Sequence, residues 1–486
     1  MTDSTQPLIY WFRNDLRLTD VPGLHAAIKT GQPLVPVYIL DTEAAGRWAP
    51  GGASRWWLHH SLAALSGAIE ERGGELLIYG GDSVAILDWL VDKTGAAGIY
   101  CSRAYEPWAA ELERSVHDHF EERDTVFKRY PGALLFEPEQ IANQAGDPFK
   151  VFTPFWKACR RQSTPNEPRP APDSGVFADL PAPRPEAASA QSLNGLQLLP
   201  TAPNWADGWE ELWLPGEAGA AERLEAFLDT GLNNYSDGRN HPALDVTSRL
   251  SPHIHFGEIS PRQVWHAVED GRRSGDEVAK FLSELGWREF SYHLLHHFPS
   301  IPEAAFKDQF ADFPWLGNKD HLKAWQRGRT GYPIVDAGMR QLWQTGYMHN
   351  RVRMVVASFL TKHLLLPWQA GEDWFWDTLV DADLASNACS WQWVAGSGAD
   401  AAPYFRIFNP TAQGEKFDKK GEYVRHWVPE IAALPDRYLH EPSTAPEEVL
   451  REAGIVLGKD YPEPIVEHKA ARQAALDAYG EIRKAS

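Results

Sequence analysis

The chain has 486 residues, enough for two or three domains and for a substantial buried core. Lys and Arg number 47 against 66 Asp and Glu, and the net charge of −19 excludes an overall basic coat for nucleic acid, although not a local basic patch. The hydrophobic fraction of 43%, with 23% charged residues, excludes a disordered chain. The 21 tryptophans are unusual, because a folded core does not ordinarily need so many.

The three cysteines, Cys101, Cys159 and Cys389, lie far apart in the sequence and form no C-x-x-C pair. This spacing excludes a disulfide scaffold, a four-cysteine zinc site and a four-cysteine iron–sulfur cluster. The first residues lack a charged-then-apolar signal pattern, and no stretch of about 18 apolar residues occurs. We therefore expect a soluble cytoplasmic protein with no metal and no membrane partner.

Residues 1–138 alternate short apolar runs with amphipathic stretches, which predicts a parallel, doubly wound sheet with helices on both faces. The expected strands are 8–12, 34–40, 76–79 and 97–100, and the expected helices include 57–71 and 83–92. No G-x-G-x-x-G follows the first strand, so a conventional dinucleotide site is not expected there. The first loop instead carries Arg13-Asn14-Asp15-Leu16-Arg17.

The chain becomes rich in Pro, Ala and Ser from Thr164 to about Ala206, which predicts a long connector within residues 139–206. Residues 207–486 then follow a helical periodicity, which predicts an all-α domain.

Local signals mark the expected ends of several helices in that second domain. Gly231 is expected to end one helix, and Ser260 is expected to cap the next because a proline follows it. A further helix is expected to begin at Pro333 and to end at Gly346.

Asp383, Asn387 and Trp391 form the densest candidate site, because they are four residues apart and would form one stripe on a helix. Small residues surround them, so a flat cofactor ring with polar edge atoms would fit against an acid, an amide and an indole. The alternative is a helix N-terminus with an Asp in its first turn and a buried Trp behind it. Spacing alone favours that alternative.

A second candidate is the run Thr247-Ser248-Arg249-Leu250-Ser251-Pro252. Hydroxyls and backbone amides that enter a helix suit a phosphate or pyrophosphate. By itself, a Ser-Pro helix cap explains this run better.

A third candidate is Glu284 with Trp287 and Arg288. Glu284 and Arg288 are one helical turn apart, which usually means a solvated ion pair. Alternatively, Glu284 is a carboxyl beside an indole in an apolar cavity, with a raised pKa. The sequence does not separate these two interpretations.

A fourth candidate is a basic stretch, since no acidic residue occurs between Asp336 and Glu372. Its basic residues are Arg340, Arg351, Arg353 and Lys362. This predicts a small positive face suited to a phosphate backbone, with a solvated basic surface as the alternative. Arg351 and Arg353 are two apart and cannot face the same way on a helix, so we expect one to meet nucleic acid and the other to be paired internally.

In this order, these segments resemble the photolyase/cryptochrome flavoproteins over nearly the whole chain. The marks are Trp11-Phe-Arg13-Asn14-Asp15-Leu-Arg17, Thr247 to Ser251, Glu284-Leu-Gly-Trp287-Arg288-Glu289, His349-Asn-Arg-Val-Arg-Met354, Trp391-Gln-Trp393 and Tyr404-Phe-Arg406-Ile-Phe-Asn409-Pro. The resemblance implies an N-terminal α/β antenna-binding domain, a long connector, and an all-α C-terminal domain that holds FAD.

The resemblance also implies the FAD contacts. They are Tyr235, Thr247, Ser248, Arg249, Leu250, Ser251, Arg288, Asn350, Arg353, Asp381, Asp383 and Asn387. Asn387 would lie beside the reactive flavin nitrogen, where an amide favours a reduced, anionic flavin; plant cryptochromes usually carry aspartate there. The implied electron-transfer relay is Trp391, Trp368 and Trp315, from the flavin to the surface.

The substrate set resembles that of the enzymes that repair cyclobutane pyrimidine dimers. It comprises Glu284, Trp287, Asn350, Met354 and Trp393. Trp287 and Trp393 would stack on a flipped-out dimer, and Glu284 would stabilise its radical anion. The DNA-binding set is Arg239, Trp287, Arg351, Trp393 and Arg406. Animal and plant (6-4) repair enzymes differ at 349–354, and their bacterial counterparts need four cysteines.

The expected antenna segment, Tyr105-Glu106-Pro107-Trp108, departs from the pattern of many folate-binding members. Trp108 would stack on a pterin, so a folate (methenyltetrahydrofolate) is favoured over a deazaflavin or a flavin. The sequence that begins at Glu284, Glu-Leu-Gly-Trp-Arg-Glu-Phe-Ser-Tyr-His, resembles that of the class III enzymes.

We therefore expect a monomeric bacterial photolyase that acts on ultraviolet-damaged DNA. A cryptochrome photoreceptor is the main alternative, and a generic electron-transfer flavoprotein is a third.

Overall fold

The computed structural model describes residues 6–123, 125–162, 164–178, 185–269, 275–401 and 405–485. The chain forms two compact units, each of which contains separate stretches of the sequence. The first unit is Met1–Phe149, Thr153–Asp229 and Ser248–Pro299; the second is Lys150–Phe152, Thr230–Thr247 and Ser300–Ser486. In the described part of the chain, no helix is both long and apolar enough to cross a bilayer.

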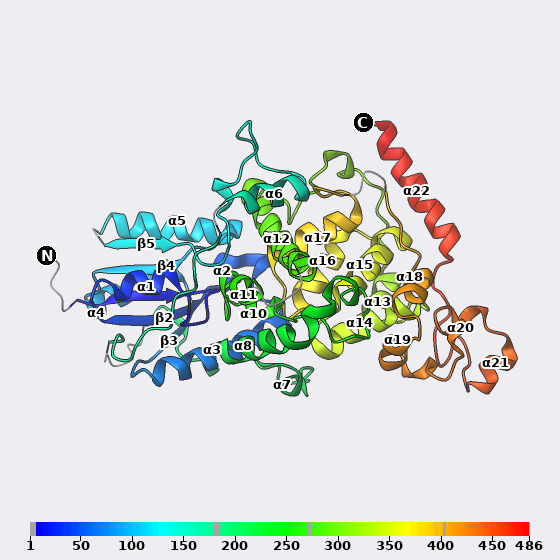
Figure 1. Cartoon of the computed structure of the whole chain (residues 1–486), viewed down its shortest axis with the longest axis horizontal. Helices are drawn as coiled ribbons and strands as arrows, with labels where there is room; N and C mark the ends of the chain where they lie inside the picture. The colour runs from blue at the N-terminus through cyan, green and yellow to red at the C-terminus, as the bar shows by residue number, and fades with distance from the viewer. Residues whose placement is uncertain are drawn as a thin grey trace. The chain divides into compact units, whose positions relative to one another are not determined.

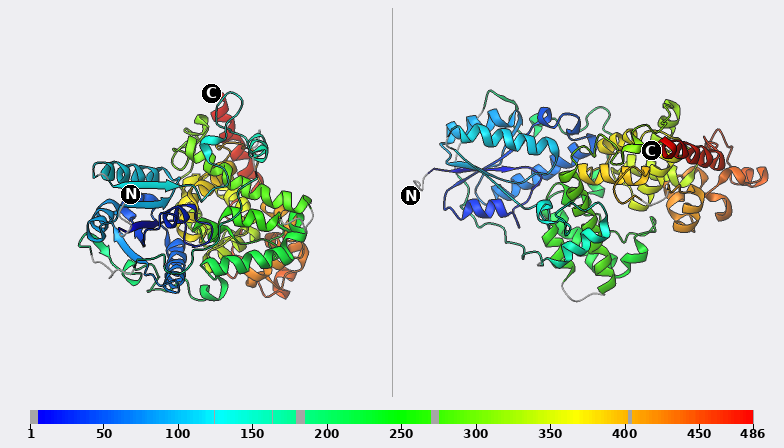
Figure 2. Two further views of the ribbon diagram at one scale, coloured as in Figure 1. Left: turned by 60° about the vertical axis from the view of Figure 1, so that its left-hand side comes forward. Right: turned by 90° about the horizontal axis from the view of Figure 1, so that it is seen from above.

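A six-stranded sheet forms the centre of the first unit, in the order β5-β4-β1-β2-β3-β6 (Figure 1). Its strands are β1 (Leu8–Phe12), β2 (Leu34–Leu40), β3 (Leu77–Gly81), β4 (Gly98–Ser102), β5 (Val126–Tyr130) and β6 (Ala188–Ala190). The first five pair in parallel, and β1 is buried along its whole length. Strands β1 to β4 confirm the four predicted strands, whereas β5 was not among the predicted strands. Helices lie on both sides of the sheet (Figure 2).

The predicted connector contributes to this sheet, because β6 lies within it and pairs antiparallel with β3. Phe177 and Leu198, from the same segment, are buried. The segment is therefore partly built into the first unit.

The helices of the first unit agree with the predicted alternation, and α3 begins five residues before the expected start at Trp57. They are α1 (Pro22–Ile28), α2 (Thr42–Ala45), α3 (Gly52–Glu70), α4 (Ser83–Thr94), α5 (Pro107–Glu121), α6 (Phe152–Arg161, whose first residue belongs to the second unit), α7 (Trp209–Leu212), α8 (Glu217–Ala226), α10 (Ser251–His255), α11 (Pro261–Val268) and α12 (Gly275–His297). Ser260 caps α11 through a capping box with Gln263, as predicted.

Gly231 does not end a helix, so that prediction is wrong. A π-helical turn over Phe227–Gly231 continues α8, and Gly231 keeps the helical φ of −72° as the next turn begins. A glycine ends a helix only where the chain turns into the left-handed conformation, which Gly231 does not adopt.

The second unit is helical. It contains α9 (Tyr235–Gly238), α13 (Lys319–Gln326), α14 (Pro333–Thr345), α15 (Asn350–Ser358), α16 (Trp368–Thr378), α17 (Leu384–Ala395), α18 (Pro410–Phe417), α19 (Glu422–Trp427), α20 (Asp436–Leu439), α21 (Glu447–Glu452) and α22 (His468–Ala485). Helix α14 begins at Pro333 and ends at Gly346 in the left-handed conformation, as predicted. Helices α14 to α17 surround the largest apolar core of this unit.

Many of the tryptophans are core residues. In the first unit Trp56 and Trp57 of α3 pack edge-on against Trp209 and Trp213. In the second unit Trp325 and Trp368 are fully buried. Much of the excess noted in the composition therefore fills the interior.

Candidate functional site

Helix α17 carries the stripe predicted from spacing. Asp383 is its N-cap and accepts a 2.8 Å hydrogen bond from the Ser386 amide, while Asn387 and Trp391 are buried one and two turns later. The capping interpretation is therefore confirmed for Asp383. The same geometry also gathers an acid, an amide and an indole along one helix.

The start of α17 is a buried polar site. Asp381, Asp383 and Asn387 are 9%, 6% and 8% exposed. Asn387 donates from Nδ2 to the carbonyl of Glu372 on α16 at 3.1 Å, which fixes the plane of its amide. Carboxylates and an amide gathered in one buried site fit a cofactor ring with polar edges.

Arg353 of α15 completes this site in the second unit. Its Nη2 donates to both carboxylate oxygens of Asp381, at 3.0 and 2.9 Å, and its Nε donates to the Met348 carbonyl at 2.7 Å. Asn350 and Met354, on the same helix, are exposed and partly exposed, so both are accessible to a ligand. Tyr235 and Thr247 belong to this unit as well.

The predicted positive face over residues 337–371 is wrong for most of its members. Arg340 pairs with Glu430 at 2.7 Å, Arg353 pairs with Asp381, and Lys362 is fully buried. The absence of acids nearby in sequence does not matter, because the acidic partners come from distant segments.

Arg351 and Arg353 do point to different partners, as predicted. Arg351 donates to Asn240 Oδ1 at 2.5 Å and lies over the ring of Phe417 at 4.4 Å. Burial and the neighbouring charge of Arg239 lower the pKa of Arg351. Two arginines that repel one another make a local positive site, which would attract a phosphate. Arg406 is exposed in the same unit.

The predicted relay tryptophans all lie in the second unit. Trp391 and Trp368 are buried, while Trp315 is partly buried and packs on Phe313 at 4.3 Å. Trp393 is partly exposed, and its Nε1 donates to the Asp400 carbonyl at 3.1 Å. Tyr404, part of the resembling motif, lies outside the described residues.

The remaining predicted FAD contacts lie in the first unit. Arg249 adopts a left-handed φ of +51°, and Ser248 Oγ accepts a 3.4 Å hydrogen bond from the Leu250 amide. Ser251 is the first residue of α10, whose N-cap, Leu250, makes no side-chain cap. Helix α10 therefore begins at Ser-Pro, as the capping interpretation expected, but without a side-chain cap from its N-cap residue.

Helix α12 carries the third candidate. Glu284 forms an ion pair with Lys280 at 2.9 Å and is a quarter exposed. Arg288 instead donates to the Ala133 carbonyl at 2.8 Å and lies 3.6 Å from Glu289. Glu284 therefore does form an ion pair, as one of the two interpretations predicted, but its partner is Lys280 and not Arg288. Trp287 is partly exposed on the same side of the helix.

The N-terminal motif has a structural role in the first unit. Asp15 accepts a 2.8 Å hydrogen bond from the Tyr10 hydroxyl, and Arg17 donates to the Gly257 carbonyl at 2.7 Å. Gly257 has a φ of +68°, and a Cβ there would approach the Asn14 carbonyl to 2.1 Å. The loop after β1 therefore braces the turn that follows α10.

In the predicted antenna segment, Tyr105 is buried and donates from its hydroxyl to Glu137 at 2.7 Å. Trp108 is partly exposed in the first turn of α5, and Arg103 lies over the Tyr105 ring at 4.8 Å.

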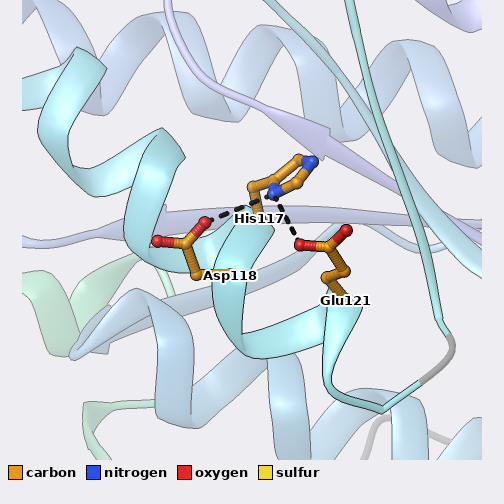
Figure 3. Close-up of side chains that lie close together, drawn as sticks. All are labelled: His117, Asp118 and Glu121. Carbon is orange, nitrogen blue, oxygen red and sulfur yellow. Dashed lines mark hydrogen bonds and ion pairs between the residues drawn. The ribbon is translucent and has the colours of Figure 1, made fainter.

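One cluster that has metal-ligating side chains is exposed on α5: His117, Asp118 and Glu121 (Figure 3). His117 Nδ1 lies 3.4 Å from Asp118 and 4.0 Å from Glu121. These are the contacts of a solvated ion pair, and nothing else there indicates a cation.

Sequence reasoning missed two residues that shape the site. Gly371 lies against the Trp391 indole, and the fully buried Trp325 packs edge-on against it at 6.2 Å. The only sequence signal for Trp325 was the overall excess of tryptophan. Gly371 gave no signal, because a single glycine in a helix has no pattern that indicates a role.

Comparisons with known proteins agree with this arrangement. Residues 8–173 match the family model described as DNA photolyase, and residues 281–481 match the FAD binding domain of DNA photolyase. The chain is 49% identical over 486 residues to the deoxyribodipyrimidine photo-lyase of Agrobacterium fabrum, with all of both chains covered. It is 38% identical to cryptochrome-1 of Arabidopsis thaliana, covering 98% of this chain and 71% of that protein.

Among solved structures, a bacterial class III photolyase from Agrobacterium tumefaciens matches with a TM-score of 0.94 and 48% identity. That match covers 100% of this chain and 99% of the other. Full-length identity of this size, together with both family models, shows that the chain belongs to the photolyase/cryptochrome family.

Proposed function

We propose that this protein is a light-driven deoxyribodipyrimidine photo-lyase of class III that uses FAD to split cyclobutane pyrimidine dimers in DNA. The observation that carries the proposal is the buried polar site at the start of α17, where Asp381, Asp383 and Asn387 lie in front of Trp391. A flavin needs such polar contacts at its edge, and the relay that photoreduces the flavin needs an indole beside them.

FAD would be held by Tyr235 of α9, by the segment 247–251, by Asn350 and Arg353 of α15, by Asp381, Asp383 and Asn387 at the start of α17, and by Arg288. When bound and reduced, FAD would supply on excitation the electron that opens the cyclobutane ring and would regain that electron afterwards, with no net redox change. Arg353 fixes Asp381 through two hydrogen bonds, and the Glu372 carbonyl fixes the Asn387 amide. Preorganised dipoles of this kind stabilise a charge without reorganisation.

Trp287 and Trp393 are proposed to stack on the dimer, and Asn350 and Met354 are proposed as further substrate contacts. Both indoles are partly exposed, as a stacking platform requires. Glu284 would stabilise the negative charge on the dimer. Arg239, Arg351 and Arg406 would bind the flanking phosphates, and the dimer, already poorly paired, would be flipped out at low cost.

A second pigment is proposed at Trp108, whose partly exposed indole could stack on its ring; we favour a folate over a deazaflavin or flavin. An absorption spectrum of the purified protein tests this: a near-ultraviolet shoulder beside the flavin bands supports the folate, and a blue-visible band contradicts it. We further propose that the enzyme acts as a cytoplasmic monomer.

The function is tested by illuminating the reduced protein with oligothymidine that contains dimers and measuring the loss of dimers. Glu284→Ala should slow repair while flavin content and photoreduction stay unchanged. Glu277→Ala, on the same helix two turns earlier, is the matched control and should repair at the wild-type rate. If the dimers stay intact after illumination of the wild-type protein, the proposal that it is a repair enzyme is contradicted.

The similarity to a plant cryptochrome supports one other candidate, a blue-light photoreceptor. The same assay separates them, because a photoreceptor would photoreduce its flavin and leave the dimers intact.

A further inference from the structure

Lys362 is an unusual lysine, because it is 0% exposed. It lies in a π-helical turn, Phe359–His363, that follows α15. Its Nζ donates to the Ala395 carbonyl at 2.6 Å and lies 3.1 Å from the centre of the Phe405 ring. Burial lowers the pKa of this amine well below its usual value, so the site keeps a lysine at a substantial cost.

One of these two contacts is explained by the end of α17. Ala395 is the last residue of that helix, and Gly396 turns the chain away with a φ of +94°. Carbonyls at a buried helix end need donors from elsewhere. Lys307 donates to the next carbonyl, that of Gly396, at 3.2 Å. Capping of this helix end therefore explains the contact of Lys362 with Ala395 but not its contact with the Phe405 ring.

The contact with Phe405 joins two different segments. Trp393 lies in the last turn of α17, and its indole is held by the Asp400 carbonyl. Phe405 directly precedes the exposed Arg406, and Tyr479 of α22 stacks on the Phe405 ring at 4.7 Å. Lys362 therefore touches the end of the helix that carries Trp393 and the anchor of the segment that carries Arg406.

We propose that Lys362 is a positioning residue for DNA binding, which fixes Trp393 and Arg406 relative to one another by bridging Ala395 and Phe405. The inference rests on the proposed function, because it assumes that Trp393 stacks on the dimer and that Arg406 binds a phosphate. Lys362 itself touches no substrate. Its effect is to preorganise the binding face, so its loss should weaken binding more than it slows the light reaction.

The test measures the dissociation constant for an oligonucleotide that contains one thymine dimer and for the same strand undamaged. Flavin content, photoreduction rate and thermal midpoint are recorded for each protein. Lys362→Met should raise the dissociation constant for the dimer strand by about tenfold, the order expected when two side chains that Lys362 held in place must be ordered on binding. The repair yield per photon at saturating DNA and the photoreduction rate should stay near wild type.

Lys307→Met is the matched control, because it removes a lysine from the same helix end that does not touch Phe405. It should lower the thermal midpoint alone. Phe405→Leu removes the ring from the other side and should weaken dimer binding similarly. In the double variant with Lys362→Met the two losses should not add, as expected for partners in one interaction.

If Lys362→Met lowers the thermal midpoint and the flavin content but leaves the dissociation constant unchanged, the lysine is structural and the proposal fails. If Lys362→Met does not fold, unchanged binding in Phe405→Leu overturns the proposal equally. If the wild-type protein does not distinguish damaged from undamaged strands, the failure lies with the proposed function instead.

Discussion

Gly371 of α16 lies directly against the indole of Trp391 on α17: a Cβ atom built at residue 371 would come within 2.1 Å of Cη2. Phe375, one turn later on α16, packs edge-on against the same indole at 5.0 Å. Two helices approach this closely only where a residue without a side chain allows it. The position of Trp391, the proposed innermost member of the relay, therefore depends on a glycine 20 residues away.

We predict that Gly371→Ala will displace Trp391 and reduce the free energy of unfolding by about 1–3 kcal/mol, as overpacking does in well-packed cores. Flavin photoreduction should slow in the same variant. Gly67→Ala is the control, since Gly67 lies inside α3 with open space around its Cα. That variant should be more stable by about 0.5–1 kcal/mol because alanine favours a helix. Urea unfolding measures both, and equal stability of the two variants would contradict the packing argument.

A second prediction concerns Arg353 and Asp381. Arg353→Met removes the Nη2 donor from a carboxylate whose side chain is 4% exposed, so we expect a loss of about 2 kcal/mol in the free energy of unfolding. Asp381 then also loses its fixed orientation, and FAD should dissociate faster. Arg353→Lys keeps the charge without the planar guanidinium and should fall between wild type and Arg353→Met. Retention of FAD at the wild-type level in Arg353→Met would show that the pair does not serve the cofactor.

Strand β5 was not predicted, since it includes Lys128 and Arg129 and none of its residues is buried; the other four parallel strands were predictable because they are apolar runs of strand length. The three residues of β6, Ala-Ser-Ala, have no such signal; their pairing with β3 is a tertiary effect. Helix ends with distinct chemistry, such as Pro333 and Ser260, were also predictable. Gly231 was not, because a glycine does not by itself decide between a helix end and a continued turn.

The site was predictable as a list of residues and not as a set of interactions. Lys280 and Arg288 are both four residues from Glu284, so spacing cannot choose between them, and the contacts of Arg288 with the segment before α6 decide the outcome. Similarly, Lys362 is a basic residue in the sequence, and its burial follows from α17 and Phe405.

A third prediction concerns the outer end of the relay. Trp315→Phe should slow the photoreduction of oxidised flavin several-fold, because phenylalanine is much harder to oxidise than tryptophan. Repair by protein reduced chemically beforehand should be unaffected, since it does not use the relay. Trp343→Phe is the control: Trp343 is a surface indole, 52% exposed, stacked on Trp374. Transient absorption after a blue flash measures the difference, and equal rates in the two variants would exclude Trp315 as the outer member.

The last prediction concerns Glu289, which is 2% exposed on α12 and accepts hydrogen bonds from the amides of Leu135 and Phe136. Burial raises the pKa of this carboxyl to about 7, although Arg288 and the two amides oppose the shift. The folded protein therefore keeps the proton up to about pH 7, whereas the unfolded chain releases it near its ordinary value of 4.5. Between these values the folded state binds more protons, so stability must fall as the pH rises.

Glu289→Gln removes this titration and keeps an oxygen that accepts from both amides. We expect the free energy of unfolding of the wild-type protein to fall by about 2–3 kcal/mol more than that of Glu289→Gln between pH 5 and pH 8. Other titrating groups are common to both proteins and cancel in the difference. Urea unfolding at several pH values measures it, and parallel curves would mean that Glu289 is already ionised at pH 5. In that case the Arg288 charge and the two amides, and not burial, would control the carboxyl.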